Sequence, residues 1–171
     1  IEADLRAAAE IQRSLLPTNT HFTDQFVMAW AFQPCEHMGG DIFNIFQVDD
    51  EHLMIYVLDV SGHGVPAAMI TVSVSQFLQQ ILVSEKRNMP SKGPAIVLDA
   101  LDREYGFERF NSFFTISYFV INLKTGQATY GNAGHPYPIH LQKSGTMELL
   151  KAAGPCIGMR DFDFIDNRKI R

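Results

Sequence analysis

Two strand-like runs, 41–48 and 52–60, do most to limit the folds open to this chain. They are separated by an acidic cluster, Asp49-Asp50-Glu51, which is typical of a tight turn. The two runs therefore predict an antiparallel hairpin in which paired residue numbers sum to about 100. In that register Asp41 lies directly opposite Asp59, at the end of the hairpin away from the turn.

Carboxylates placed opposite each other across a hairpin repel, so this pair needs compensation. The neighbouring sequence offers little, because from Ser14 to Glu85 the chain has eight acidic residues and neither Lys nor Arg. The remaining possibilities are backbone N–H groups, a distant cation, proton uptake or a bound metal ion. A divalent ion between the two acids is the simplest of these, and oxygen-only ligands favour Mg²⁺ or Mn²⁺ over zinc.

Asp59 ends an apolar run and is followed by Val-Ser-Gly-His-Gly (60–64) and a helical pattern over 64–86. Gly62 and Gly64 allow a sharp turn, and the helix N-terminus behind them is a favourable place for anions. Asp59 could instead cap that helix, although capping does not explain an acid that comes several residues before it.

The remaining pattern indicates an α+β domain with antiparallel sheets. Helices are predicted over 1–17, ended by Pro17, and over 93–106. The apolar stripe of 1–17 could pack on the core, or continue upstream as a coiled coil toward a sensor domain. Further strand-like runs are 26–34, 112–122, 128–142, 146–152 and 161–171.

Composition excludes several classes of protein. The 171 residues suit one domain, and a net charge of −5 argues against a nucleic-acid partner. The longest apolar runs are far shorter than the roughly 20 residues of a membrane span. Two cysteines, Cys35 and Cys156, are too few for a disulfide framework and are expected to be buried. We therefore expect a cytoplasmic protein without a membrane or nucleic-acid partner.

The stretch "CEHMGGDIF" (35–43) has some likeness to the glycine-rich hairpin of diguanylate cyclases. That family places two adjacent acids on its hairpin, whereas here Ile42 follows Asp41. The segment "LDVSGHG" (58–64) also has no place in that fold. A cyclase is therefore not the prediction.

Four motifs, in the same order, resemble another family. The chain is similar over nearly its whole length to the SpoIIE/RsbU-like branch of the PPM-type (metal-dependent, phosphatase-2C-like) serine phosphatases. The motifs are "AEIQRSLLP" (9–17), "GGDIFNIF" (39–46), "LDVSGHGVPAAM" (58–69) and "FFTISYFVINLKTGQATYGNAGHPYP" (113–138).

The resemblance implies an αββα sandwich of two antiparallel sheets flanked by helices, with two Mn²⁺ or Mg²⁺ ions per complete site. The ions assist in-line attack of water on phosphoserine or phosphothreonine. The implied metal ligands are Asp41, Asp59 and the backbone carbonyl of Val60. Residues 1–17 would be a helix linking to an upstream receiver or sensor domain, and could mediate a homodimer. Residues 18–171 would be the phosphatase domain without its C-terminal part, acting on an anti-sigma-factor antagonist.

This chain departs from the family pattern at several places. The family's later acids do not appear before Arg171, so we expect these residues to hold only part of the metal site. Asn44 stands in place of an acid common in the bacterial branch, and we expect it to support the ligands. Ser61 occupies the position of a His that the eukaryotic branch offers as general acid, and His63 is offset from it. The stretch from Ser14 to Glu85, which has no Lys or Arg, offers no Arg to clamp phosphate.

Further candidates come from the two glycine-containing turns. Gly62 and His63 could contact phosphate, or His63 could brace its loop. Asn132 and His135 could touch substrate or brace their turn. Glu36 and His37 could reach a metal, although the resemblance does not support it. A rival hypothesis from another class is a degenerate phosphatase fold that acts as an adaptor for a sigma factor or its regulator.

Overall fold

A computed structural model describes residues 2–19, 21–24, 26–34, 38–84, 93–159 and 168–170 of the chain. Helices and strands alternate in blocks, as expected of an α+β protein. In chain order they are α1 (Glu2–Arg13), β1 (His21–Thr23), β2 (Phe26–Val27), β3 (Asp41–Gln47), β4 (His52–Val60), α2 (Gly64–Ser84), α4 (Pro94–Glu104), α5 (Phe107–Phe110), β5 (Phe114–Asn122), β6 (Ala128–Ala133), β7 (Ile139–Leu141), β8 (Met147–Leu149) and β9 (Arg168–Ile170).

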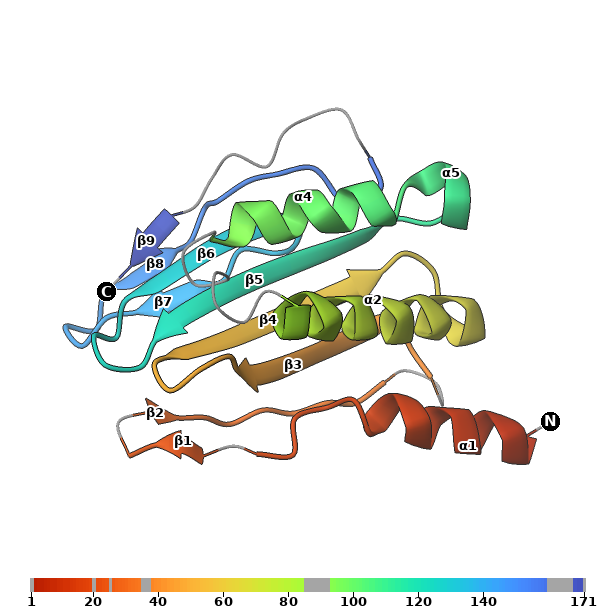
Figure 1. Cartoon of the computed structure of the whole chain (residues 1–171), viewed down its shortest axis with the longest axis horizontal. Helices are drawn as coiled ribbons and strands as arrows, with labels where there is room; N and C mark the ends of the chain where they lie inside the picture. Colours follow the sequence, from red (N-terminus) through yellow and green to blue (C-terminus); the bar gives the residue numbers. More distant parts are fainter. Residues whose placement is uncertain are drawn as a thin grey trace.

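A five-stranded antiparallel sheet in the order β3-β4-β5-β6-β9 forms the centre of the molecule (Figure 1). Strands β1 and β2 form one separate two-stranded ribbon, and β7 and β8 form another. The β3–β4 register pairs Asp41 with Asp59, which confirms the predicted hairpin. The β4–β5 register then pairs Asp59 with Thr115.

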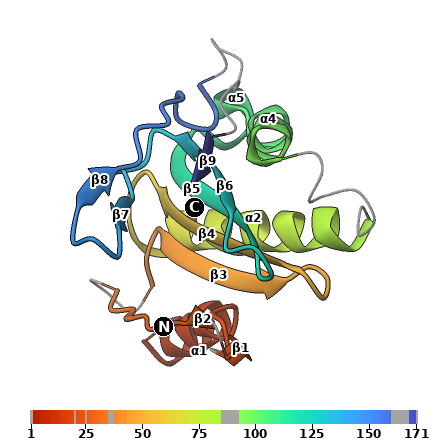
Figure 2. The ribbon, with the colours of Figure 1, turned by 90° about the vertical axis from the view of Figure 1, so that its left-hand side faces the viewer.

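One face of this sheet carries the main core. Helices α2 and α4 lie on this side, away from the β7–β8 ribbon (Figure 2). Because side chains alternate along a strand, the even-numbered residues of β3 and β4 point toward these helices. The buried residues of this core include Ile42, Met54, Tyr56, Leu58, Val74, Leu78, Leu98, Leu101, Ile116 and Tyr118.

The opposite face of the sheet is covered only in part. Phe22, Phe26 and Met28, from β1, β2 and the residue after β2, pack against a cluster that includes Ile45 and Leu53. Farther along the sheet, a second cluster joins Tyr130 to Leu150 and Ala152. Toward the end where β3 begins and β4 ends, Asp41, Asp59 and Val57 stay exposed on this face.

Several of the predicted strands and helices are longer than the observed ones. The run 26–34 is a strand only at Phe26–Val27, and 128–142 divides into β6 and β7 around a turn that contains Pro136 and Pro138. Prolines have no N–H to donate to a sheet, which explains the break. Helix α1 ends at Arg13, four residues before Pro17. Of 161–171 only 168–170 are described, as β9.

Two smaller expectations can also be compared with the structure. Cys156 is half-buried rather than buried, and Cys35 lies outside the described residues. Among the helices that the structure describes, none combines the length and the apolar character that crossing a bilayer would require.

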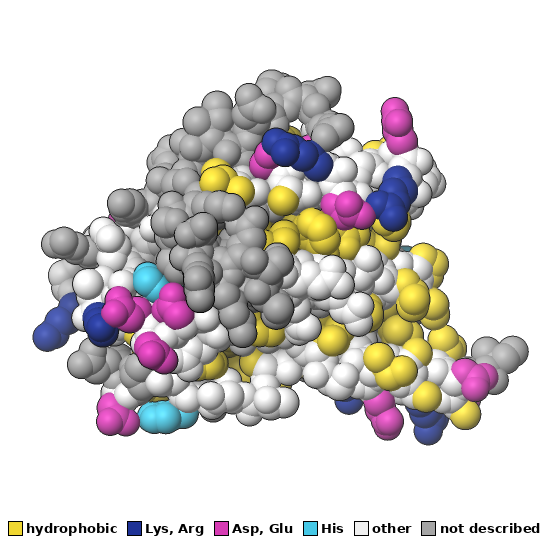
Figure 3. All heavy atoms as spheres, in the orientation of Figure 1, with side chains coloured by type: hydrophobic (Ala, Val, Ile, Leu, Met, Phe, Trp, Pro, Cys, Tyr) yellow, Lys and Arg dark blue, Asp and Glu magenta, His cyan; other side chains and the backbone are white. Residues whose placement is uncertain are grey.

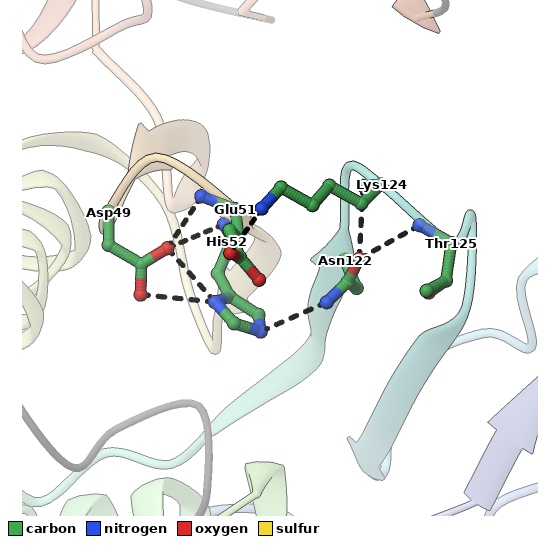
Figure 4. Close-up of polar contacts among 6 residues, drawn as sticks. All are labelled: Asp49, Glu51, His52, Asn122, Lys124 and Thr125. Carbon is green, nitrogen blue, oxygen red and sulfur yellow. Dashed lines mark hydrogen bonds and ion pairs between the residues drawn. The ribbon is translucent and has the colours of Figure 1, made fainter.

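The turns at one end of the sheet are joined by a polar cluster (Figure 4). The Asp49 carboxylate accepts hydrogen bonds from the backbone N–H groups of Glu51 and His52, both at 2.8 Å, and lies 2.9 Å from His52 Nδ1. The Lys124 ammonium, from the β5–β6 turn, lies 2.5 Å from Glu51 Oε1. Acidic side chains gather on the surface at this end of the molecule, beside Lys or Arg side chains (Figure 3).

These contacts determine how the pKa of Asp49 departs from its usual value. Burial alone would raise the pKa, but the hydrogen bonds from Glu51 and His52 outweigh it and the pKa is lowered. A carboxyl group whose pKa is lowered in the folded state stabilises the fold at pH values above its unfolded-state pKa. That contribution is lost as the pH falls through the folded-state pKa.

We predict that Asp49→Asn lowers the free energy of unfolding by about 0.5–1 kcal/mol at pH 7, because exposed charged hydrogen bonds contribute about this much. The difference from wild type should shrink below about pH 4, where the unfolded-state carboxyl group takes up its proton. Urea unfolding at a series of pH values measures both quantities. Asp50→Asn, in the same turn, is the control and should change little. A loss that stays constant down to pH 2.5 would contradict the prediction.

Candidate functional site

The two acids of the hairpin meet at the end of the sheet farthest from the polar turns. Asp41 is the first residue of β3, and Asp59 lies one residue before the end of β4. Both are odd-numbered, so they share the face opposite the main core. Burial, the negative charge of Asp59 and a hydrogen bond with Asp59 all raise the pKa of Asp41. The hairpin therefore holds two carboxyl groups together at the expense of the ionisation of Asp41.

A close backbone approach lies next to this pair. The Val60 N–H donates to the Gly40 carbonyl at 3.0 Å. A Cβ added at Gly40 would lie only 2.4 Å from the Val60 carbonyl oxygen. Glycine is therefore required here, because any side chain would push the Val60 carbonyl out of place.

The donors at this corner are two carboxylates and the Val60 carbonyl, if that oxygen turns toward a bound ion. Oxygen-only sets of this kind suit Mg²⁺ or Mn²⁺, so the residues present fit the expected metal. No group of three or more His, Cys, Asp or Glu side chains suited to a metal occurs in the described part of the chain. The described residues thus bring two carboxylates together, which is fewer than the acidic ligands expected of a complete two-ion site.

Gln12 joins the first helix to the loop before Asp41, a link that the sequence analysis missed. Its side chain is only 2% exposed. Its Nε2 donates to the Gly39 carbonyl at 2.7 Å and to Thr71 Oγ1 at 2.8 Å, and its Oε1 accepts from the Gly39 N–H at 3.3 Å. A glutamine within the apolar repeat of residues 1–17 was the available signal.

Thr115 and His135 extend the row of side chains from Asp59. Thr115 pairs with Asp59 across β4 and β5, and its Oγ1 lies 2.8 Å from His135 Nδ1. Burial lowers the pKa of His135, and the negative charge of Asp59 opposes this only in part. The imidazole is therefore neutral at pH 7 and stands beside the acidic pair.

Asn132 braces the turn that carries His135. Its Oδ1 accepts the His135 N–H and its Nδ2 donates to the His135 carbonyl, both at 2.9 Å. The same Nδ2 lies 3.1 Å from Ser117 Oγ. Because Asn132 is 4% exposed and its amide is used in these bonds, the bracing hypothesis fits this residue better than substrate contact.

The turn between β4 and α2 has the predicted glycine geometry. Gly62 and Gly64 have φ angles of 96° and 71°, which favour glycine. His63, between them, is exposed. Ser61 is fixed to the start of β5: its Oγ lies 2.9 Å from Ser112 Oγ and accepts from the Phe113 N–H at 3.1 Å.

Of the three remaining candidates, Asn44 does not join the acidic pair. Asn44 is buried, and its Nδ2 donates to the Leu15 carbonyl. It lies three residues after Asp41, so strand alternation directs it to the opposite face, and the expectation that it supports the ligands was wrong. Glu36 and His37 lie outside the described residues.

We predict that Gly40→Ala destabilises the protein by about 1–3 kcal/mol, the usual cost of forcing extra atoms into a packed position. It should also weaken Mn²⁺ binding, because the Val60 carbonyl must move. The matched control is Gly39→Ala, whose Cβ would come no closer than 3.7 Å to its nearest neighbour. Urea unfolding and isothermal titration calorimetry with Mn²⁺ measure the two effects. Equal losses of stability and of Mn²⁺ affinity in the two variants would contradict this account of Gly40.

We also predict that the effect of Asp41→Asn changes sign with metal. In EDTA the variant should melt about 1–4 °C above wild type, because removing a repulsion worth up to about 1 kcal/mol produces a shift of that size. In Mn²⁺ at about 100 times its Kd, metal binding raises the free energy of unfolding of wild type by about 2.7 kcal/mol. The variant should lose most of this stabilisation. Thermal melts monitored by circular dichroism should show the variant with the higher melting temperature in EDTA and wild type with the higher melting temperature in Mn²⁺. The same order in both conditions would rule out a metal between these acids.

Comparison with known proteins identifies the family to which this chain belongs. The model of the family described as "Stage II sporulation protein E (SpoIIE)" matches residues 49–170. The chain is 30% identical over 167 residues to the phosphoserine phosphatase RsbP of Bacillus subtilis (strain 168), covering 94% of this chain and 40% of RsbP. It therefore spans less than half the length of that relative.

Solved structures agree on the fold. The SiaA-PP2C domain of Pseudomonas aeruginosa superposes with a TM-score of 0.77 at 21% identity, covering 99% of this chain and 66% of that one. RsbX in complex with magnesium superposes with a TM-score of 0.55 at 18% identity, covering 78% of this chain and 60% of that one. The expected α+β fold and the resemblance stated from the motifs are both confirmed. The chain belongs to the SpoIIE family and has the fold of a PPM-type, phosphatase-2C-like phosphatase domain.

Proposed function

We propose that this chain forms the catalytic domain of a metal-dependent protein phosphatase that hydrolyses phosphoserine or phosphothreonine. The observation that carries the proposal is the Asp41–Asp59 pair, held face to face by the β3–β4 register in a stretch without Lys or Arg. The name of RsbP as a phosphoserine phosphatase and the magnesium complex of RsbX support the activity and the cofactor.

Asp41, Asp59 and the Val60 carbonyl would hold Mn²⁺ or Mg²⁺, two ions in a complete site. When bound, such ions lower the pKa of water and neutralise phosphoryl oxygens. The chain between Ser14 and Glu85 has no Lys or Arg to balance the phosphate, which supports a role for the metal in substrate binding.

The chain's own groups would then orient the substrate. The N-terminus of α2, reached through Gly62 and His63, presents backbone N–H groups that favour an anion. His135, fixed by Thr115 and by the turn that Asn132 braces, presents a neutral ring beside Asp59. A neutral imidazole with Nδ1 bonded to a hydroxyl can donate from Nε2 to a phosphoryl oxygen.

The proposed substrate is a phosphorylated anti-sigma-factor antagonist, as the likeness to the SpoIIE/RsbU-like branch implies. The proposed setting is the cytoplasm, with α1 linking the domain to an upstream receiver or sensor and offering a surface for a homodimer. These proposals rest on the resemblance, whereas the hydrolytic activity also rests on the acidic pair.

The test measures phosphate release from a phosphoserine protein by the full-length protein, with and without Mn²⁺. We expect Asp59→Asn to lower the Mn²⁺-dependent rate at least about 100-fold, equivalent to about 2.7 kcal/mol of transition-state stabilisation. The control Asp50→Asn makes the same chemical change in the distant β3–β4 turn and should leave the rate unchanged.

The adaptor hypothesis makes the opposite predictions. An adaptor should bind its partner with the same affinity after Asp41 or Asp59 is changed, and Mn²⁺ should not affect either protein. Equal rates for wild type and Asp59→Asn would therefore favour the adaptor over the enzyme.

A further inference from the structure

A pocket with a volume of about 360 Å³ opens beside His135. It is lined by Asn132 and Gly134–Tyr137 on one side and by Ala153 and Gly154 on the other. Apart from His135 and Tyr137, no lining residue has an ionisable side chain, and Pro136 and Ala153 are apolar. Ligand pockets usually have volumes of about 300–1,000 Å³, so this pocket is at the small end of the range and has room for one or two side chains.

The two walls of the pocket are fixed to each other. The Gly134 N–H donates to the Gly154 carbonyl at 2.9 Å. Gly134 has a φ of 67°, and a Cβ there would lie 2.6 Å from Cys156 Sγ, so the walls pack as closely as glycine allows. The buried Asn132 holds the rest of the turn. The pocket is therefore formed before any ligand arrives.

The pocket lies next to the acidic pair. His135 lines it, and the same ring contacts Thr115, which is the cross-strand partner of Asp59. Neighbouring strands are about 4.8 Å apart, so the pocket begins roughly 10 Å from Asp59. An extended peptide covers this distance with about three residues.

We propose that this pocket binds an uncharged apolar side chain of the phosphoprotein substrate, located within about three residues of the phosphoserine. The proposal rests on the phosphatase function proposed above and adds a determinant of substrate choice. Tyr137, which is 42% exposed, offers a ring face to the incoming side chain. A charged side chain would lose part of its hydration beside Pro136, Ala153 and the two glycines, and this loss costs free energy.

The test compares two phosphoserine peptides that differ only in carrying leucine or glutamate at the positions flanking the phosphoserine. We expect wild type to prefer the leucine peptide by about tenfold or more in kcat/KM, the usual size of an apolar-pocket effect. Ala153→Leu should fill the pocket and remove most of that preference, and Tyr137→Ala should reduce it. Both side chains are exposed, so neither change disturbs the core. Ala3→Leu, at an exposed position of α1, is the control and should keep the preference.

Two further measurements separate the failure of this proposal from that of the phosphatase function. Hydrolysis of p-nitrophenyl phosphate by wild type with Mn²⁺ reports the phosphatase function without any peptide. Fluorescence anisotropy with the two labelled peptides reports binding whether or not hydrolysis occurs. Equal affinity and equal kcat/KM for both peptides, or the same loss on both peptides in Ala153→Leu, would overturn the pocket proposal. Absence of p-nitrophenyl phosphate hydrolysis, together with retained preference in binding, would overturn only the phosphatase function.

Discussion

The register between β3 and β4 is the constraint on which the site depends. Ile42 and Leu58 pair across this hairpin and are both buried against the helices. A slip of one residue would turn them toward solvent, so the hydrophobic core fixes the pairing. Asp41 and Asp59 are the next pair outward, with their side chains on the other face. Packing on one face of the sheet thus forces two like charges together on the other, and the free energy of the core sustains a repulsion that local contacts do not relieve.

The N-terminal helix is part of the same arrangement. Gln12 bonds both backbone groups of Gly39 and also Thr71 of α2, so α1, the loop before Asp41 and the long helix share one buried side chain. Buried amides of this kind are costly to leave unsatisfied, so the three elements are expected to move together. A displacement of α1 would break these bonds two residues from Asp41. The position of the first helix is therefore coupled to the geometry of the acidic pair.

The sequence was sufficient for the hairpin and its facing acids, because alternation and an acidic turn fix both pairing and direction. The strands predicted over 26–34 and 128–142 are too long, because the apolar runs continue past the residues at which strand pairing stops. Asn44 was misplaced although strand parity alone separates it from Asp41. Thr115 and Gln12 could not be found locally, since their contacts join residues 20 to 59 positions apart. Such contacts depend on strand order and helix docking, which the pattern of one segment does not encode.

The acids of this hairpin are compensated very differently at its two ends. At the turn, Asp49 accepts backbone N–H groups and Glu51 is paired with Lys124, which comes from 73 residues later in the chain. At the other end, no Lys or Arg among the described residues forms an ion pair with Asp41 or Asp59, and the pKa of Asp41 is raised. A chain that can bring a distant lysine to one end of its hairpin has the means to neutralise the other end as well. An end that no described Lys or Arg neutralises meets a requirement of the divalent-ion site proposed above, since a resident ammonium would occupy the position and repel the metal.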